Sequence, residues 1–517
     1  MSFQVRRVTE ARKKYRFPWA KLPLLIGVLR PLSRWYASAK ARKEEKARAS
    51  HRTLLLKRFL LVLIAVLCAF LLFAGTVKAL VGLHVISMRS LVSLTGTELP
   101  KDEAGFTNIL LLGEGNADHD GKDLTDTIMV VSFDPAQTKS AVLLSLPRDL
   151  YLLKTDKMGK GRINSLYRDY KILLKRQGMS EREASLESMK ELGTTIGSAL
   201  HLQIHHVIKV NFTGFEQAID AIGGIDVTVP EAINDTEYPD ENYGYETFSI
   251  AAGPAHLDGK TALKYARSRH TSSDFDRSGR QQQIIVAIGE KVKKDGLYKN
   301  PATITDLLKV FSDNVVMTMT VRELIGLAGL AEDLTSDHVI TMQLNDRNAL
   351  YDSIVEPGGF LYTPPRDQFD GASVLLPVSI PEFPVTWKQI DTLSALLFYR
   401  RSLYLARPTI AVLNAGAKTG LARKLGNELT RYGFNVQRIE NINIPKAELR
   451  NANMGSYVYA ENPEDATTKS FFADLLHLPI VTHPVPLIPA EQTSQIVIVL
   501  DRDYGFKPLQ DLLSTGQ

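Results

Sequence analysis

The sequence predicts an α/β protein attached to one N-terminal membrane span. Strand-like apolar runs alternate with helix-like amphipathic runs, and this alternation is typical of α/β layers. One uncharged stretch precedes those runs and is long enough to cross a bilayer. The composition is that of an ordinary globular chain, because 44% of the 517 residues are hydrophobic and 23% are charged. Most of the chain is therefore expected to fold in water, and a disordered or multi-span protein is excluded.

The uncharged stretch runs from Phe59 to Val77. Its length is close to the roughly 20 residues that a helix needs to cross the hydrocarbon core of a membrane. A cleaved signal peptide is the alternative, but its apolar region usually has only about 7 to 15 residues. We therefore expect a single transmembrane helix at residues 59–78.

The charges divide sharply on either side of this span. Residues 1–58 hold 17 lysines and arginines against three acids, a net charge of +14, whereas the rest of the chain holds 45 against 54, a net of −9. The positive-inside rule places the basic tail, residues 1–58, in the cytoplasm and residues 79–517 outside, so the expected location is the cell membrane. Attraction to anionic lipid explains such a tail; nucleic-acid binding is the alternative, but no reader motif is recognisable and no specific nucleic acid is expected.

After a juxtamembrane linker, residues 79–100, a first folded domain is expected at residues 101–380. Its predicted strands are 108–113, 127–133, 140–146, 206–210 and 224–229, and its predicted helices are 179–200, 215–221 and 281–294. Residues 230–250 carry proline, asparagine and aspartate without a period, and this pattern predicts a surface loop.

Prolines between Pro364 and Pro384 indicate a domain boundary, and residues 381–407 are expected to form a linker. The pattern then restarts with a strand (TIAVLN), an amphipathic helix (LARKLGNELTRYG) and another strand (FNVQRIE), and IVIVL at 496–500 follows. Residues 408–503 are therefore expected to form a small second α/β domain, of a common domain size.

The densest group of charged residues contains four arginines and two aspartates within 14 residues: Arg267, Arg269, Asp274, Asp276, Arg277 and Arg280. Clustered guanidinium groups suit phosphate or pyrophosphate, because each binds two oxygens and stays charged. Arg277 and Arg280 are three residues apart and precede the predicted helix that contains Gln281, so they share a face near a helix N-terminus. A solvated surface with internal ion pairs remains the alternative.

Further charged residues lie at predicted loops. Arg148 and Asp149 follow a strand, and Arg162 follows a glycine-rich turn. Four aspartates, Asp118, Asp120, Asp123 and Asp126, lie in one acidic loop that can hold a hard cation or can simply be solvated. Cys68 is the sole cysteine, so a metal site would need oxygen or imidazole ligands.

Taken in chain order, seven segments resemble the LytR-CpsA-Psr family of bacterial cell-envelope phosphotransferases: NILLLG, LTDTIMVVSFDP, LLSLPRDLY, GRINSLY, VNFTGFEQAIDAIGGIDVTVP, HLDGKTALKYARSRH and DFDRSGRQQ. PTIAVLNAGAKTGLARKLGNELTRYGF and IVIVLDRDYG resemble the LytR carboxy-terminal domain. The resemblance implies an α/β/α sandwich with a mixed central sheet and a lipid pocket. It also implies transfer of a glycopolymer from a polyprenyl-pyrophosphate carrier to peptidoglycan, with formation of a phosphodiester outside the membrane.

The resemblance implies roles for individual residues. The matched pyrophosphate-binding residues are Arg148, Arg162, Arg267, Arg269, Arg277, Arg280 and Gln281, of which Arg148, Arg267 and Arg269 would act in catalysis with Asp126. Asp126 matches an aspartate that binds magnesium or activates the acceptor hydroxyl. Asp149 and Asp274 would support the arginines.

One segment departs from the family pattern. Where the family carries an aspartate two residues after the glycine of its first strand, this chain has Gly115. We expect Asp118 or Asp120 to replace it as a magnesium ligand beside Asp126, although solvated turn residues are the alternative. Because of this departure, a second function remains an alternative: a non-catalytic scaffold that binds wall glycan or lipid carrier. A membrane-attached transcription regulator is a third possibility, for which the tail offers no folded DNA-binding pattern.

Overall fold

The computed structural model describes residues 99–116, 122–240, 244–269, 274–296, 314–330, 335–346, 359–377, 385–442, 455–462, 465–481 and 494–513. All of them belong to a compact unit that spans Ser87–Gln517. The basic tail and the expected membrane span lie outside the described residues. Within the described ranges, no helix combines the length and apolarity needed to cross a bilayer.

A six-stranded mixed sheet forms the centre of the first domain. Its strand order is β11-β6-β1-β2-β3-β12, with bounds Val315–Met317, His206–Val210, Thr107–Glu114, Thr125–Asp134, Ser140–Leu146 and Val339–Gln343. β1, β2 and β3 form an antiparallel meander, whereas β6 is parallel to β1 and β12 is parallel to β3. The predicted α/β class and mixed sheet are confirmed.

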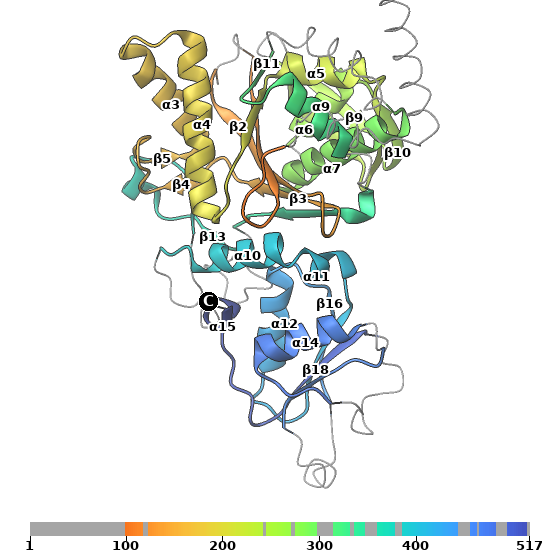
Figure 1. Cartoon of the computed structure of the whole chain (residues 1–517). Helices are drawn as coiled ribbons and strands as arrows, with labels where there is room; N and C mark the ends of the chain where they lie inside the picture. Colours follow the sequence, from red (N-terminus) through yellow and green to blue (C-terminus); the bar gives the residue numbers. More distant parts are fainter. Residues whose placement is uncertain are drawn as a thin grey trace, which may run out of the picture. The chain divides into compact units, whose positions relative to one another are not determined.

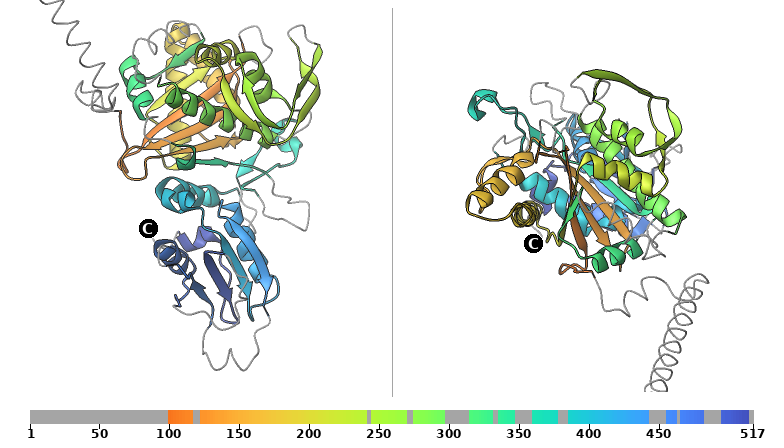
Figure 2. Two further views of the ribbon diagram at one scale, coloured as in Figure 1. Left: turned by 90° about the vertical axis from the view of Figure 1, so that its right-hand side faces the viewer. Right: turned by 90° about the horizontal axis from the view of Figure 1, so that it is seen from above.

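Helices cover both faces of this sheet because successive strand residues point to opposite sides. Val130 and Leu144 belong to the core beneath α3 (Ile163–Arg176) and α4 (Glu181–Leu200). The adjacent residues, such as Val131 and Leu143, pack on the other face against Ile285 of α7 (Asp274–Lys294). Figures 1 and 2 show α3 and α4 on one side of the strands and α5 (Phe212–Ala221), α6 (Gly259–Arg267) and α7 on the other.

Residues 230–250, expected as a surface loop, contain an antiparallel hairpin of β8 (Ile233–Pro239) and β9 (Tyr245–Ile250). Ile233, Tyr238 and Phe248 point into a local core shared with β7 (Ile225–Val229) and α6. An irregularity between Asp235 and Tyr238 shifts the strand register. This shift breaks the simple alternation of apolar and polar residues by which a strand is recognised in a sequence.

Residues 388–406, part of the expected linker, form helices α10 (Lys388–Tyr399) and α11 (Arg401–Ala406). Leu393, Leu396 and Leu397 are buried at helical spacing. On the side of α4, the Ser394 hydroxyl donates to the carbonyl of Leu200, and the Tyr399 hydroxyl donates to that of His201 at 3.2 Å. The segment is therefore part of the hydrophobic core.

The C-terminal region has its own four-stranded sheet, in the order β16-β15-β18-β17. The strands are Val436–Asn441, Ile410–Asn414, Ile496–Leu500 and Tyr457–Tyr459, and helices α12 (Leu421–Arg431) and α14 (Ala466–Leu476) accompany them. Both β15 and β18 are buried at every position, so this central pair forms a second α/β core.

Candidate functional site

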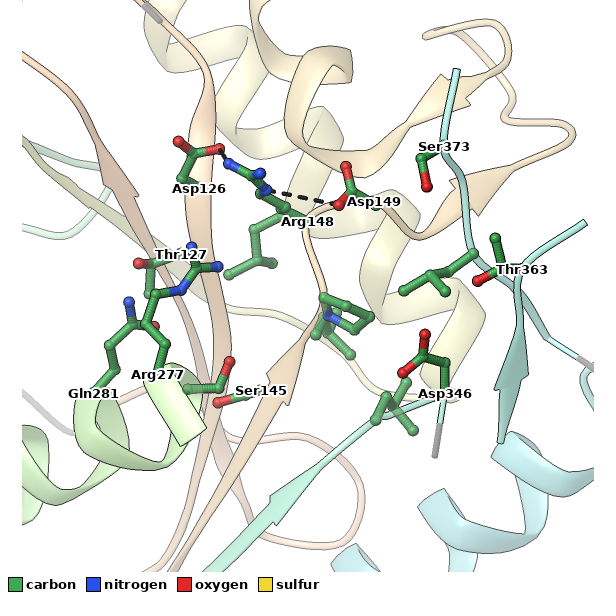
Figure 3. A pocket seen from close by; sticks show the side chains of 16 residues that line it. Asp126, Thr127, Ser145, Arg148, Asp149, Arg277, Gln281, Asp346, Thr363 and Ser373 are labelled. Carbon is green, nitrogen blue, oxygen red and sulfur yellow. Dashed lines mark hydrogen bonds and ion pairs between the residues drawn. The ribbon is translucent and has the colours of Figure 1, made fainter. Parts of the chain in front are cut away.

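A cavity of about 190 Å³ lies at the end of strand β3. It is bounded by the start of β2, the turn after β3, the first turns of α7 and residues from the stretches 344–346 and 363–375 (Figure 3). Five of the sequence-predicted residues line it: Asp126, Arg148, Asp149, Arg277 and Gln281. The site is small compared with the ~300 Å³ or more of pockets that enclose drug-sized ligands, so it suits the reacting ends of larger molecules.

The fold places Arg148 and Asp149 at the cavity through a sharp strand ending. All seven residues of β3 are buried, and Pro147 then lacks the backbone N–H that a further ladder bond would need. The backbone N–H of Leu150 donates to the carbonyl of Pro147 at 3.1 Å and closes a turn. Arg148 and Asp149 occupy the middle of this turn, so their polar side chains leave the core where the strand stops.

A chain of ion pairs connects these residues. The Arg148 Nη1 atom donates to Asp126 Oδ1 at 3.2 Å, and Arg148 Nε lies 3.7 Å from Asp149 Oδ2 (Figure 3). Asp149 Oδ1 also accepts from Arg162 Nη1 at 3.3 Å. Arg162 ends β5 (Gly161–Arg162), which pairs with β4 (Tyr151–Leu152). Two carboxylates thus orient the guanidinium of Arg148 between them.

The pairing of β1 with β2 fixes the backbone beside Asp126. Gly113 lies opposite Thr127, and a Cβ atom at Gly113 would come within 2.9 Å of the Thr127 Cβ atom. The glycine therefore permits a close approach that any larger residue would disturb.

Asn164 is a buried neighbour of Asp126 and belongs to the GRINSLY segment, although no role was predicted for it. Its Nδ2 atom lies 3.5 Å from Asp126 Oδ1. Its Oδ1 atom is buried and has no hydrogen-bond partner within the described part of the chain. A buried amide oxygen of this kind is ready to accept from a ligand or to contact a cation.

Helix α7 brings Arg277 and Gln281 to the cavity. The helix begins at Asp274, earlier than the predicted residue 281, so Arg277 lies within it and is only 6% exposed. The buried Gln282 fixes the helix on the sheet, because its Nε2 atom donates to Ser145 Oγ at 2.9 Å and to the carbonyl of Met342 at 2.7 Å. A buried guanidinium at a cavity wall attracts anions strongly, since little water screens its charge. The supporting role of Asp274 stays a prediction.

Arg267 and Arg269 do not line this cavity. The guanidinium of Arg267 lies 4.1 Å from the ring centroid of Phe212, and it donates to the Tyr238 hydroxyl at 3.2 Å. Burial raises the pKa of Tyr238. The backbone N–H of Arg269 donates to Asp235 Oδ2 at 3.1 Å. Their predicted part in pyrophosphate binding and catalysis stays a prediction.

The guanidinium of Arg280 is directed at backbone carbonyls. Its Nε atom donates to the carbonyl of Tyr265 at 2.8 Å, and its Nη2 atom donates to that of Ser268. Burial lowers the pKa of Arg280, whose side chain is nearly inaccessible. These bonds join α7 to the end of α6, so Arg280 positions the arginine-bearing segment.

The acidic loop is only partly described. Asp118 and Asp120 lie outside the described residues, and Asp123 forms an ion pair with Lys171 at 2.8 Å. Glu114, which precedes Gly115, pairs with the buried Lys209. Within the described ranges, no group of three or more histidine, cysteine or acidic side chains has the arrangement of a metal site.

Sequence reasoning missed one wall of the cavity. Asp346, Thr363 and Ser373 lie on the far side of Asp149 from Arg277 and Gln281 (Figure 3). No local pattern in the sequence identifies these residues, because their position depends on long-range pairing with the turn after β3.

Comparison with known proteins gives the site a family context. The LytR_cpsA_psr family model matches residues 88–367, and a second model, described as LytR cell envelope-related transcriptional attenuator, matches residues 407–504. A polyisoprenyl-teichoic acid–peptidoglycan teichoic acid transferase TagU of Bacillus cereus is 26% identical over 55% of this chain and 79% of its own length.

Two further relatives have related names. The cell wall biosynthesis protein LcpA of Corynebacterium glutamicum is 26% identical over 80% of this chain and 76% of its own length. The polyisoprenyl-teichoic acid–peptidoglycan teichoic acid transferase TagV of Bacillus subtilis is 30% identical over 46% of this chain and 56% of its own length. Since the first family model covers more than half of the sequence, the chain belongs to the LytR-CpsA-Psr family and carries a LytR carboxy-terminal domain.

Proposed function

We propose that this protein is a membrane-anchored phosphotransferase that moves a glycopolymer from a polyprenyl-pyrophosphate carrier to a hydroxyl group of peptidoglycan. The observation that carries the proposal is the arrangement of Arg148 between two carboxylates, in the same cavity as the buried Arg277. The names of the relatives, which describe transferases of wall polymers, support this class of reaction.

The proposed step breaks a phosphoanhydride bond of the pyrophosphate and forms a phosphate ester bond to the acceptor. The acceptor oxygen forms a bond to the phosphorus next to the glycopolymer, and the bond from that phosphorus to the bridging oxygen breaks. Polyprenyl phosphate leaves with the bonding electron pair, and the proton of the hydroxyl passes through a cavity carboxylate to water. Such a reaction depends on positioning and on stabilisation of charge, which fixed guanidinium groups provide.

The ion pairs suit this step because they hold Arg148 without removing it from the cavity. Its side chain is 27% exposed. Two guanidinium groups, those of Arg148 and Arg277, can therefore face the oxygens of one pyrophosphate, with the amide of Gln281 beside them. Two aspartates keep Arg148 oriented in advance, so little reorganisation is needed when the substrate enters.

Magnesium is part of the proposal, with Asp126 as a ligand and Asp118 or Asp120 as the second acid. The residues present fit this ion, because the side chain of Asp126 is 44% exposed and lies next to the amide of Asn164, whose Oδ1 atom has no hydrogen-bond partner within the described residues. Magnesium prefers oxygen ligands and commonly uses one or two carboxylates, substrate phosphates and water. When bound, it would neutralise charge that develops on the phosphates.

Transfer assays with the full chain test the proposal. Arg148→Ala and Arg277→Ala are expected to lower kcat/KM about 100-fold, the usual size of a lost electrostatic contact in a transition state. Arg148→Lys should be nearly as poor, because lysine lacks the forked geometry. The exposed Arg182→Ala is the matched control.

The remaining outcomes separate the alternatives. Normal transfer by both alanine variants would remove these arginines from the site. Donor binding without any turnover in the unaltered protein would favour the scaffold. Magnesium-dependent transfer by Asp126→Ala, Asp118→Ala and Asp120→Ala tests the metal site. If only Asp126→Ala lowers transfer, neither Asp118 nor Asp120 replaces the missing family aspartate. If none of the three variants lowers transfer, the metal assignment is wrong.

The proposed location is the cell membrane, with residues 79–517 outside the cytoplasm. The net charge of +14 before Phe59 motivates this topology through the positive-inside rule. Alkaline phosphatase fused after Gln517 should be active in a bacterial host. An inactive phosphatase fusion together with an active cytoplasmic reporter would reverse the topology.

A further inference from the structure

We infer that Asp346, Thr363 and Ser373 form the acceptor-binding wall of the cavity and select the hydroxyl-bearing sugar that attacks the phosphorus. The inference rests on the proposed function and deepens it, because it assigns the second substrate to a part of the site that the family motifs do not cover. We call these three residues the hydroxyl wall, and Arg148, Arg277 and Gln281 the cationic wall.

The two walls differ in chemistry. The cationic wall offers two guanidinium groups and an amide, which suit a charged pyrophosphate. The hydroxyl wall offers one carboxylate and two hydroxyl groups. A carboxylate repels phosphate oxygens but accepts hydrogen bonds from the hydroxyl groups of a sugar, and the side chains of serine and threonine can both donate and accept.

The position of the hydroxyl wall matches the geometry of the reaction. In phosphoryl transfer the attacking and leaving oxygens lie roughly in line, on opposite sides of the phosphorus. Figure 3 shows Arg277 and Gln281 on one side of Arg148, and Thr363, Ser373 and Asp346 on the other. When a pyrophosphate binds to the cationic wall, the opposite side of its phosphorus faces the hydroxyl wall. That side therefore stays open to the attacking hydroxyl group.

Backbone pairing holds the hydroxyl wall in register with Arg148. The backbone N–H of Leu375 donates to the carbonyl of Asp149 at 2.9 Å, and that of Tyr151 donates to the carbonyl of Leu375 at 2.8 Å. Ser373 lies two residues before Leu375, and both line the cavity, as expected for alternate residues of an extended segment.

Asp346 and Thr363 are fixed in a similar way. The backbone N–H of Leu344 donates to the carbonyl of Ser145 at 3.0 Å, which continues the pairing of β12 with β3 as far as the cavity. The carbonyl of Asn345 accepts from the N–H groups of Phe360 and Leu361 at 3.0 and 3.1 Å. The wall is thus assembled on the same strand ends as Arg148, and it is preorganised for a second ligand.

Two-substrate kinetics of the full chain test this inference, with a lipid-linked glycopolymer as donor and peptidoglycan fragments as acceptor. Asp346→Asn is expected to raise the KM for the acceptor about tenfold, the usual effect of weakening a hydrogen bond to a charged group. Thr363→Val and Ser373→Ala should each raise it about threefold. The KM for the donor should change less than twofold in all three variants.

Asp367→Asn is the matched control, because Asp367 is exposed on the same segment and does not line the cavity. A raised KM for the donor, or unchanged kinetics in all three variants, overturns the inference. If Asp346→Asn does not fold, the two hydroxyl variants still decide the question. Absence of transfer in the unaltered protein would instead refute the proposed function, so the two failures are distinguishable.

Discussion

At the scale of single residues, the arginines that look alike in the sequence have different environments. Arg148 and Arg277 line the cavity, Arg267 packs on aromatic rings, and Arg280 binds backbone carbonyls. Arginines that lie close together in the sequence therefore have different roles in the folded protein. Substitution of the arginines that line the cavity should lower activity, whereas substitution of the arginine that binds backbone carbonyls should lower stability.

Arg280→Ala is expected to lower the free energy of unfolding by about 2 kcal/mol, because the carbonyls of Tyr265 and Ser268 lose a charged donor. Arg280→Lys should recover less than half of this loss, since lysine cannot reach both carbonyls with a planar fork. Chemical denaturation measures both variants, and Arg182→Ala is the exposed control. An Arg280→Ala protein of unchanged stability would show that these carbonyl bonds contribute little.

Of the predicted residues that line the cavity, Asp126, Arg148 and Asp149 lie next to strand ends, and Arg277 and Gln281 lie near the start of α7. Asp126 and Arg148 flank long apolar runs, and such runs mark a loop where a buried strand stops. Asp346 and Ser373 could not be predicted, because the backbone bonds from Leu344 to Ser145 and from Leu375 to Asp149 join positions that are far apart in the chain. Their role depends on partners that no local pattern reveals.

At the scale of elements, β6 begins with the buried His206 and is preceded by the half-buried His205, and both histidines respond to pH. Burial lowers the pKa of His206 and, just before the strand, that of His205. Glu323 lies 3.7 Å from His206 Nε2 and opposes the shift without cancelling it. The folded state therefore favours the neutral imidazoles.

A lowered histidine pKa has a defined consequence for stability. Between the folded pKa and the unfolded value of about 6.5, the unfolded chain binds more protons. The contribution of these histidines to the free energy of unfolding should therefore be fully present above about pH 6.5 and should be lost as the pH drops below that value. Thermal unfolding of His206→Phe between pH 7.5 and 5 should show a weaker dependence on pH than the unaltered protein, whereas the exposed His338→Phe should not. Equal pH slopes in all three proteins would contradict this account.

Hydrophobic periodicity predicted the strands of the central meander but missed several other elements, among them α3, α6, α10 and the β8–β9 hairpin. The strands of the central meander are long and apolar, so they agree with the structure to within two residues at each end. The β8–β9 hairpin was missed because its register shift disrupts the alternation. The proline-rich break concealed α10, although its leucines have helical spacing.

At the scale of the whole molecule, one arginine connects the segment after the break to the central sheet. The side chain of Arg401 is 2% exposed. It donates to the carbonyl of Ser132 at 3.0 Å and to the hydroxyl of Ser132 at 2.6 Å, and it lies 4.0 Å from the ring centroid of Phe106. Burial lowers its pKa to about 10, which still leaves it charged at neutral pH.

Arg401→Met should therefore lower the free energy of unfolding by about 3 kcal/mol, because several buried acceptors lose their donor together. The adjacent, exposed Arg400→Met is the control and should change it by less than about 0.5 kcal/mol. Denaturant titration monitored by tryptophan fluorescence gives both values. Similar stabilities for the two variants would show that the contacts of Arg401 are not needed.

The burial of α10 and α11 also has an evolutionary consequence. Residues 388–406 fall between the two family models, where a spacer would be free to drift in sequence and in length. Their contacts with α4 and with Ser132 instead lead us to expect that changes there are as costly as changes in the strands. In a deep mutational scan for function, variants with insertions between Lys388 and Ala406 should be lost as often as variants with insertions within β2. Insertions in the spacer should be tolerated only before Trp387.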